Sequence, residues 1–376
     1  MKHRFSLAIL CITVACLLAA PRMSAAAAAD ESFLLNMETL KKMGVDSRDV
    51  VLGGVSDDAS IALASHKETD PKKIAKGQIW WLHFFRLDWP GKTANHDMVS
   101  LPLARVDQYA FAPDMKSVVV VGNGGTVVLN VNLASKQIRP IFKYEKGKPG
   151  FRIQPPTFWI EDGKLTTSGY FYNEDQFLTL QAAVSVDPNG SGLTAFTTVR
   201  DITGINETMK FYADSVWNSS TQAYFSLRES EKPLIFAIYA YGGDPSKMDL
   251  VDRGAWVDSM ASGQDRVIYA VRQADGTSKT RVYEQGSKQS WQVGDGKSNY
   301  TYLYMSRDGS TALVCLLELE KRKMSTWYAH DSDKFRLHPM PGMMDVFPGT
   351  IRMAHTGKAL SFFTDKGIYF RRIPAP

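Results

Sequence analysis

The chain has 376 residues, 44% of them hydrophobic and 22% charged, and its 44 lysines and arginines exceed its 39 acidic residues to give a net charge of +5. Three of the basic residues, Lys2, Arg4 and Arg22, lie in the N-terminal 29 residues, and without them 41 basic residues face 39 acidic ones, an excess of +2. That balance gives no indication of nucleic-acid binding or of a polybasic membrane patch. No segment after residue 29 is apolar and long enough to span a bilayer.

Residues 1–29 have the composition of a secretory signal peptide. Lys2, His3 and Arg4 precede the apolar stretch 5–20, and the alanine-rich stretch 23–29 offers the small residues that a signal peptidase needs. The alternative is an N-terminal membrane anchor, but the apolar run is short and no stop-transfer pattern follows it. We therefore expect an exported protein, periplasmic or secreted.

Cleavage near residue 29 would leave one cysteine, Cys315, since Cys11 and Cys16 lie within the signal. An intramolecular disulfide is then impossible, so the exported chain must be held together by packing. Cys315 stands in the apolar run 312–317 and is predicted to be a buried structural thiol rather than a nucleophile.

Residues 30–45 are predicted to form a short helix. Phe33, Leu34, Met37 and Leu40 are spaced at three and four residues, and Gly44 is a natural stop. Ser32 or Asp30 would cap its start. Such a helix either packs on the following domain or docks a partner.

Residues 46–376 contain mostly strand signals and are predicted to form one domain. Short β-branched or aromatic runs are bounded by Gly, Asp, Asn, Ser or Pro, as in 50–52, 79–85, 118–121 and 126–131. These runs do not alternate with long amphipathic helices, which argues against a parallel α/β fold.

A degenerate repeat runs through this domain. Seven times, a hydrophobic run leads into a short polar or glycine turn and then a second hydrophobic run, at a spacing of roughly 45 to 56 residues that is typical of four-stranded propeller blades. The turns centre on residues 57–58, 113–116, 161–163, 218–220, 262–263, 307–309 and 355–357. A bulky apolar residue precedes each turn: Val55, Phe111, Trp159, Trp217, Met305 and Met353, with Met260 one place out of register. A large residue that recurs at one position is what packing between blades requires.

The clearest copy, Phe111-Ala112-Pro113-Asp114-Met115-Lys116 followed by a valine run, resembles the F-S-P-D-G-K turn of the WD40-like repeats in TolB-type propellers. The resemblance implies a bladed β-propeller over residues 50–373, with six to eight blades. The seven copies of the repeat favour an all-β fold of seven blades with four antiparallel strands each. The last copy has residues for two or three strands only, so we expect the strand near Val50-Val51-Leu52 to complete the last blade and close the ring.

The motifs of common enzymes are missing. No Gly-x-Ser-x-Gly occurs, and no His-x-His or His-x-x-x-His pair stands beside a carboxylate. Gly122-Asn123-Gly124-Gly125 joins two strands and is predicted to be a hairpin turn rather than a phosphate loop. We therefore predict no catalytic, cofactor-binding or metal-binding residue and no cofactor.

Aromatic residues crowd a few segments, and Trp80, Trp81 and Trp89 are the candidate partner-binding residues. They form either core between blades or a rim that offers rigid apolar area to a protein. We interpret the chain as an exported soluble propeller that acts as a protein-binding or scaffold module in the periplasm or cell envelope. The alternative is a propeller enzyme, or the propeller subunit of one, acting on a sugar, peptide or small redox substrate. It would require several Asp, Glu, His, Arg or Tyr side chains to converge at one end of the channel.

Overall fold

The computed structural model describes residues 32–45, 50–144, 150–173, 178–187, 193–198, 214–219, 221–295, 300–318, 323–340, 342–343 and 345–376. The predicted signal peptide, residues 1–29, lies outside these ranges. Within them, no helix combines the length and the apolar character needed to cross a membrane.

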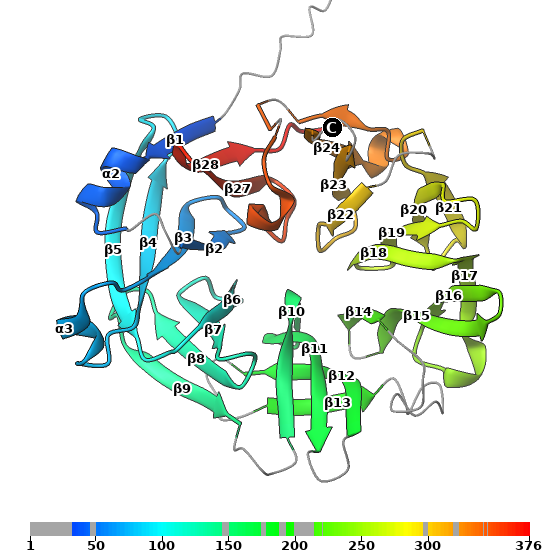
Figure 1. The fold of residues 1–376 in the computed structure, drawn as a ribbon, viewed down its shortest axis with the longest axis horizontal. Coiled ribbons are helices and arrows are strands. Elements are labelled where there is room, and N and C mark those ends of the chain that lie inside the picture. Colours follow the sequence, from blue (N-terminus) through cyan, green and yellow to red (C-terminus); the bar gives the residue numbers. More distant parts are fainter. Residues whose placement is uncertain are drawn as a thin grey trace, which may run out of the picture. The chain divides into compact units, whose positions relative to one another are not determined.

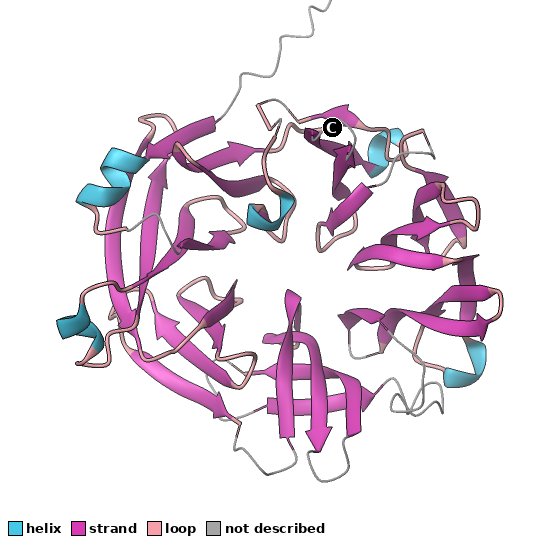
Figure 2. Cartoon of the chain, in the orientation of Figure 1, coloured by secondary structure: helices cyan, strands magenta, loops and turns pink. Residues whose placement is uncertain are grey.

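Seven antiparallel sheets of four strands stand around a common axis, which confirms the seven-bladed propeller (Figures 1 and 2). In blade 1 the strands are, from the axis outward, β2 (Val50–Val55), β3 (Ile61–Lys67), β4 (Trp80–Asp88) and β5 (Thr93–Leu101). Blade 2 has β6 (Val106–Phe111), β7 (Ser117–Gly122), β8 (Val127–Asn132) and β9 (Ile138–Lys143). Blade 3 has β10 (Gly150–Glu161), β11 (Lys164–Asn173), β12 (Leu178–Val186) and β13 (Leu193–Thr198).

The remaining blades repeat this order. Blade 4 has β14 (Asp214–Ser219), β15 (Gln222–Glu231), β16 (Leu234–Tyr241) and β17 (Asp249–Gly254). Blade 5 has β18 (Trp256–Gly263), β19 (Arg266–Arg272), β20 (Ser278–Glu284) and β21 (Gln289–Gln292). Blade 6 has β22 (Tyr300–Met305), β23 (Thr311–Glu318), β24 (Lys323–His330) and β25 (His338–Pro339). Blade 7 has β26 (Arg352–Met353), β27 (Ala359–Thr364), β28 (Gly367–Arg372) and β1 (Ser32–Asn36).

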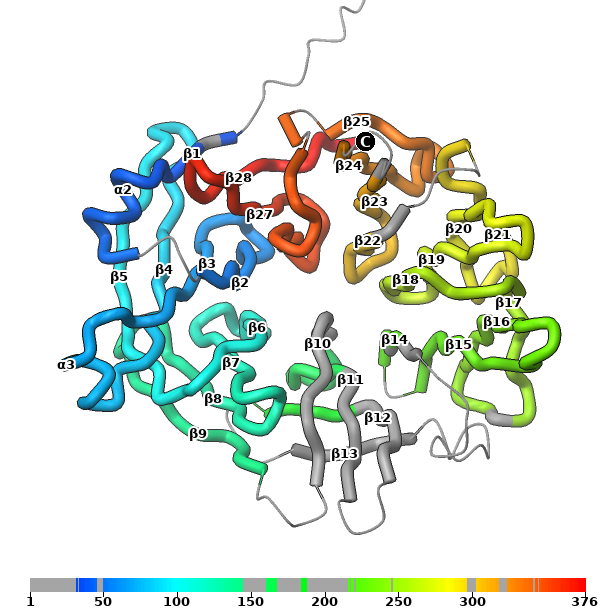
Figure 3. The backbone as a smooth tube through the Cα atoms, in the orientation of Figure 1, coloured from blue at the N-terminus to red at the C-terminus, as the bar shows by residue number. Residues whose placement is uncertain are grey.

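The ring is closed by β1, and the prediction that Val50-Val51-Leu52 completes the last blade is wrong. β1 pairs with β28, from Ser32 opposite Arg371 to Asn36 opposite Gly367, so the first described strand lies beside the last (Figure 3). Residues 50–52 belong to β2, the inner strand of blade 1. The apolar residues of this closing strand also fit a helical spacing, and a run this short does not distinguish a helix from a strand.

The helix predicted over 30–45 is correspondingly shorter. Helix α2 covers Met37–Lys42, and the Asn36 side chain caps it by accepting a hydrogen bond from the Thr39 backbone N–H at 2.9 Å. The residues expected at its start, Ser32–Asn36, are the strand β1 instead. A second short helix, α3 (Pro71–Ile74), and three 3₁₀ turns, η2 (Pro245–Lys247), η3 (Asp331–Asp333) and η4 (Pro348–Thr350), lie in connections between strands.

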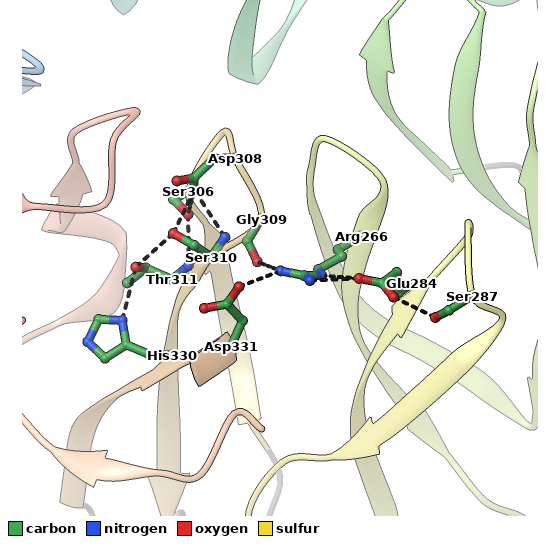
Figure 4. A network of polar contacts seen from close by, with 10 residues as sticks. All are labelled: Arg266, Glu284, Ser287, Ser306, Asp308, Gly309, Ser310, Thr311, His330 and Asp331. Atoms are coloured by element: carbon green, nitrogen blue, oxygen red, sulfur yellow. Dashed lines mark hydrogen bonds and ion pairs between the residues drawn. The ribbon is translucent and has the colours of Figure 1, made fainter. Parts of the chain in front are cut away.

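All seven repeat copies coincide with the connection from the inner strand of a blade to its second strand. In blade 6 the Asp308 carboxylate organises this turn (Figure 4). It accepts hydrogen bonds from the Ser306 hydroxyl at 2.6 Å and from the Ser310 backbone N–H at 3.0 Å. Asp58 makes the same contacts with Ser56 and Ser60 in blade 1. The aspartate therefore replaces backbone partners that a tight turn leaves unsatisfied.

The core lies between blades rather than within them. Alternate residues of β7 face opposite neighbours: Val118 and Val120 pack with blade 1, whereas Val119 and Val121 pack with blade 3. This is the period of two expected for a strand buried on both faces. The bulky residues before the turns, Val55, Phe111 and Met305, also belong to these inter-blade clusters.

Polar contacts also join neighbouring blades. Arg266 of β19 donates hydrogen bonds to Glu284 of its own blade, and to the Gly309 carbonyl and the Asp331 carboxylate of blade 6 (Figure 4).

Cys315 is fully buried in β23, and burial raises the pKa of its thiol to about 12, as expected of a structural cysteine.

Residues 122–125 form the predicted hairpin turn, which joins β7 to β8. Asn123, Gly124 and Gly125 have positive φ angles of 56°, 74° and 79°, the conformation that glycine and asparagine adopt most readily. The Asn123 side chain accepts hydrogen bonds from the backbone N–H groups of Ala104 and Arg105. The turn is thereby fixed to the connection between blades 1 and 2.

Candidate functional site

The two ends of the propeller carry different connections, because each blade is a four-stranded meander. We call the end with the turns between first and second strands, such as 56–60 and 306–310, the turn face. The opposite end carries the connections between second and third strands and those from blade to blade, such as 68–79 and 340–351, and we call it the loop face. Helices α2 and α3 and the turn η4 all lie in loop-face connections.

Trp80, the first residue of β4, is part of the core between blades 1 and 2. It is 6% exposed, and its indole N–H donates a hydrogen bond to the Ala104 carbonyl at 3.0 Å. The side chain therefore links blade 1 to the connection that enters blade 2 and lies within this seam rather than at the surface.

Trp81 is half-buried at the loop-face end of β4 and holds the start of the 68–79 connection. Its indole N–H donates to Glu68 at 2.7 Å, and the Lys73 ammonium lies 5.7 Å from its ring centroid. Burial would raise the pKa of Glu68, but hydrogen bonds from Asp70, Trp81 and Lys73 lower it to about 2. The carboxylate is thus charged and anchors α3 on the loop face.

Trp89 lies after β4, on the turn face. Its indole N–H donates to the Ala59 carbonyl at 2.7 Å, and the Arg372 guanidinium carbon lies 5.0 Å from its ring centroid. The structure therefore does not bring the three tryptophans together: Trp80 and Trp81 lie near the loop face, and Trp89 lies near the other. Their role in partner binding stays a prediction.

Exposed apolar side chains concentrate on the loop face. Among the described residues, four of the exposed large hydrophobic side chains lie in its connections or begin strands there: Ile74, Leu234, Trp256 and Phe347. Tyr302, the third residue of β22, contacts Phe347. The other two, Met98 and Leu250, lie within the outer strands β5 and β17. Tyr302 and Phe347 are in ring contact with each other, and exposed aromatic side chains on a rigid scaffold are candidates for an interaction site.

Phe347 is the most exposed of these residues, at 56%, and lies just before η4 in the connection between blades 6 and 7. Its ring makes an edge contact with Tyr302, whose side chain is 38% exposed, with the ring centroids 6.4 Å apart. The Tyr304 hydroxyl donates to the Pro348 carbonyl at 2.8 Å. Tyr302 and Tyr304 of β22 therefore hold the connection that carries Phe347.

Trp256 begins the inner strand of blade 5 and is 43% exposed. Its ring lies edge-on to Phe236 of β16, with centroids 4.9 Å apart. Leu234, at the start of the same strand β16, is also exposed. Nothing in the sequence marks Trp256 or Phe347 as exposed, since single aromatic residues in strand-rich chains are usually core.

Ionisable side chains converge on the axis at the turn face. Arg307, in the first turn of blade 6, donates a hydrogen bond through Nη2 to the Ile160 carbonyl of blade 3, across the ring. Its backbone N–H donates to the His355 carbonyl at 2.7 Å, and the Thr356 hydroxyl donates to the Asp57 carbonyl at 3.1 Å. Turns of blades 1, 3, 6 and 7 are thus connected around the axis.

Burial controls the charge of this cluster. It lowers the pKa of Arg307, although Asp57 and Glu161 act in the opposite direction. Burial also lowers the pKa of His355, against the effect of Asp57, while the positive charge of Arg307 adds to the lowering. His355 is therefore neutral near pH 7. Arg307 and His355 occupy the same position of the repeat, the first residue of the turn in their blade. Only the closed ring brings this position to the axis.

Among the described residues, no group of three or more His, Cys, Asp or Glu side chains is arranged to hold a metal ion. The histidines His66, His83 and His96 do come together in blade 1, as a linear chain of hydrogen bonds. The sequence does not indicate this group, because the three histidines lie far apart on three different strands.

Comparison with known proteins shows the fold but no close relative. No protein-family model and no curated protein matches the sequence. Among solved structures, an acylaminoacyl peptidase of Pyrococcus horikoshii aligns with a TM-score of 0.55 at 8% identity, over 86% of this chain and 51% of that one. This chain therefore spans about half the length of that protein.

Two further structures are covered almost entirely. A chain of the mitotic checkpoint complex aligns with a TM-score of 0.50 at 12% identity, over 88% of this chain and 91% of that one. The β-propeller domain of the Trilobed protease from Pyrococcus furiosus aligns with a TM-score of 0.50 at 8% identity, over 87% and 94%. Identities this low support the fold alone. The sheet order and these matches together show that the chain folds as a seven-bladed β-propeller.

Proposed function

We propose that the chain is an exported protein-binding or scaffold propeller of the periplasm or cell envelope, and that its loop face holds the partner. The observation that carries the proposal is the concentration of exposed Phe347, Trp256, Leu234 and Ile74 on that face, with Tyr302 in contact with Phe347. Aromatic side chains mounted on a rigid scaffold lose little entropy on binding and supply most of the energy in many interfaces.

The loop face also contains the longer connections, which suit recognition. The connection 68–79 carries α3 with Lys72 and Lys73, and the connection 340–351 carries η4 beside Phe347. Loops on a rigid scaffold commonly hold binding residues. Trp81 supports this surface by its contact with Glu68, and Trp80 supports it from the seam below.

The test is capture from the envelope fraction of the source cells, followed by affinity measurement with the purified partner. Phe347→Ser and Trp256→Ser are expected to weaken binding by about tenfold or more each, because central aromatic anchors usually cost that much. Met98→Ser and Leu250→Ser are the matched controls, since they remove exposed apolar side chains away from the loop face. Equal loss in all four variants, or binding unchanged in the loop-face pair, contradicts the proposal.

The second candidate is a propeller enzyme or enzyme subunit, acting on a sugar, peptide or small redox substrate at the end of the channel. It is favoured by the convergence of Arg307, His355, Asp57 and Glu161 at the axis. His355→Gln in the same capture series separates the two functions. Partner capture that persists in this variant supports binding through the loop face, and capture that is lost while the melting temperature is retained moves the site to the axis.

A further inference from the structure

Three imidazole rings form a continuous hydrogen-bonded chain across blade 1. His66 Nδ1 lies 2.8 Å from His83 Nε2, and His83 Nδ1 lies 2.7 Å from His96 Nε2. The rings come from three neighbouring strands, β3, β4 and β5. His83 uses both nitrogens within the chain, so the group is linear and does not converge on one point.

The chain lies on the side of blade 1 that faces the ring closure. His83 is opposite Ala64 and His96 is opposite Phe85 in the sheet register, so these four side chains share one face. His83 and His96 both stack on the Phe85 ring. Phe85 and Ala64 belong to the cluster that contains Leu35 of β1, Leu40 of α2 and Phe370 of β28.

Proton counting shows what the chain tolerates. Three neutral rings carry three N–H groups, and two of them fill the two hydrogen bonds when all rings point the same way. One extra proton can be placed on His96, at the half-buried end, without losing either bond. A second extra proton sets two N–H groups against each other, which breaks a bond and leaves charge beside the apolar cluster.

The surroundings of His83 and His96 determine their protonation. Burial lowers the pKa of His83 to about 3, and His66 and His96 lower it further. Burial also lowers the pKa of His96, with Asp97 raising it and Lys136 lowering it. The charges on the packed elements, Glu38, Lys41 and Lys42 of α2 and Arg371 and Arg372 of β28, are not among the groups that shift either histidine.

We propose that the chain His66–His83–His96 is a proton-sensitive catch on ring closure, which holds blade 1 against β1 and α2 when neutral and loosens this seam first when the surroundings turn acidic. The sign follows from linkage. The pKa values of His83 and His96 are lower in the folded protein than in the opened seam, so opening takes up protons. The stabilisation is complete above the ordinary histidine pKa of about 6.5 and is lost progressively as the pH falls from there toward 3.

Hydrogen exchange of the full chain at pH 7.5 and pH 5, corrected for the intrinsic rate, tests the proposal. In the wild type, amides of β1 and α2 are expected to lose protection by about tenfold or more at pH 5, since each proton taken up contributes a factor of ten per pH unit. His96→Gln, at the half-buried end, should reduce this loss by about threefold or more. His338→Gln, in blade 6 and outside the chain, should leave it unchanged.

Two outcomes overturn the proposal. If β19 in blade 5 loses protection in parallel with β1, the acid effect is global unfolding. If β1 and α2 keep their protection at pH 5, no catch exists. Ring ¹⁵N spectra of the wild type give a check that needs no variant. At pH 7.5, His66, His83 and His96 should each show one bare and one protonated ring nitrogen. Three rings that titrate independently near pH 6.5 contradict an ordered row of hydrogen-bonded histidines.

Discussion

At the scale of single residues, side chains packed between blades occupy repeated positions, whereas the groups that meet at the axis come from turns far apart in the sequence. Phe111 and Met305 each precede a turn of the repeat, and both are buried between blades. Arg307 and Ile160 are 147 positions apart, and nothing in either local sequence indicates that they meet. Trp80 was predicted as a candidate for binding, but the same bulk makes it a good core residue, and the sequence alone does not decide between the two.

Gly263 illustrates a residue that its neighbouring blade requires. A Cβ atom there would lie 1.8 Å from the Ser306 carbonyl oxygen and 2.9 Å from the Gly309 nitrogen, both backbone atoms of blade 6. Gly263→Ala is expected to lower the free energy of unfolding by about 1–3 kcal/mol or more, because backbone atoms must move to admit the methyl group. Gly286→Ala is the control, since its Cβ would meet only Asp265 at 3.7 Å. Denaturant unfolding that finds equal stabilities for the two variants contradicts this packing.

At the scale of elements, strands and turns were well predicted and the N-terminal segment was not. Every turn of the repeat joins an inner strand to the next strand, because Asp, Gly and Asn have local backbone reasons to be there. Ser32–Asn36 has no such local reason to be a strand. It becomes one because β28 presents an unpaired edge, a tertiary cause that is not visible in the segment itself.

The aspartate of the first turn in blade 6 gives a pH-dependent prediction. Burial would raise the pKa of Asp308, but hydrogen bonds from Ser306 and Ser310 bring it below the ordinary 3.8. Asp308→Ala should destabilise the chain by about 1–2 kcal/mol at pH 7, through the loss of these bonds. The wild type should lose this advantage as the pH falls below about 4, because the carboxylate is protonated less readily when folded. Chemical denaturation of both proteins from pH 7 to pH 3 measures the difference, and a gap that widens in acid contradicts the assignment.

At the scale of the whole molecule, stability depends on a closed ring of sheets that bury each other's faces. β1 supplies the outer strand of blade 7, and Leu35 is 4% exposed in the cluster between blades 7 and 1. Without this strand, β28 has an open edge and the cluster loses a buried leucine. Closure is therefore the point at which residues far apart in sequence stabilise the entire fold.

A chain that begins at Met37 tests this dependence against a chain that begins at Ser32. The shorter chain should melt several degrees lower, because the loss of Leu35 alone is worth about 2–5 kcal/mol, and it should associate through the open strand edge. Calorimetry and light scattering measure the two effects. Equal melting temperatures for the two chains would show that the ring does not need its closing strand.

The hydrogen bond from Arg307 to the Ile160 carbonyl affects how solutes can move along the propeller axis. A solute that moves along the axis past this contact would have to break the hydrogen bond between the Arg307 guanidinium and the Ile160 carbonyl. The contact therefore adds a barrier to movement along the axis at the turn face.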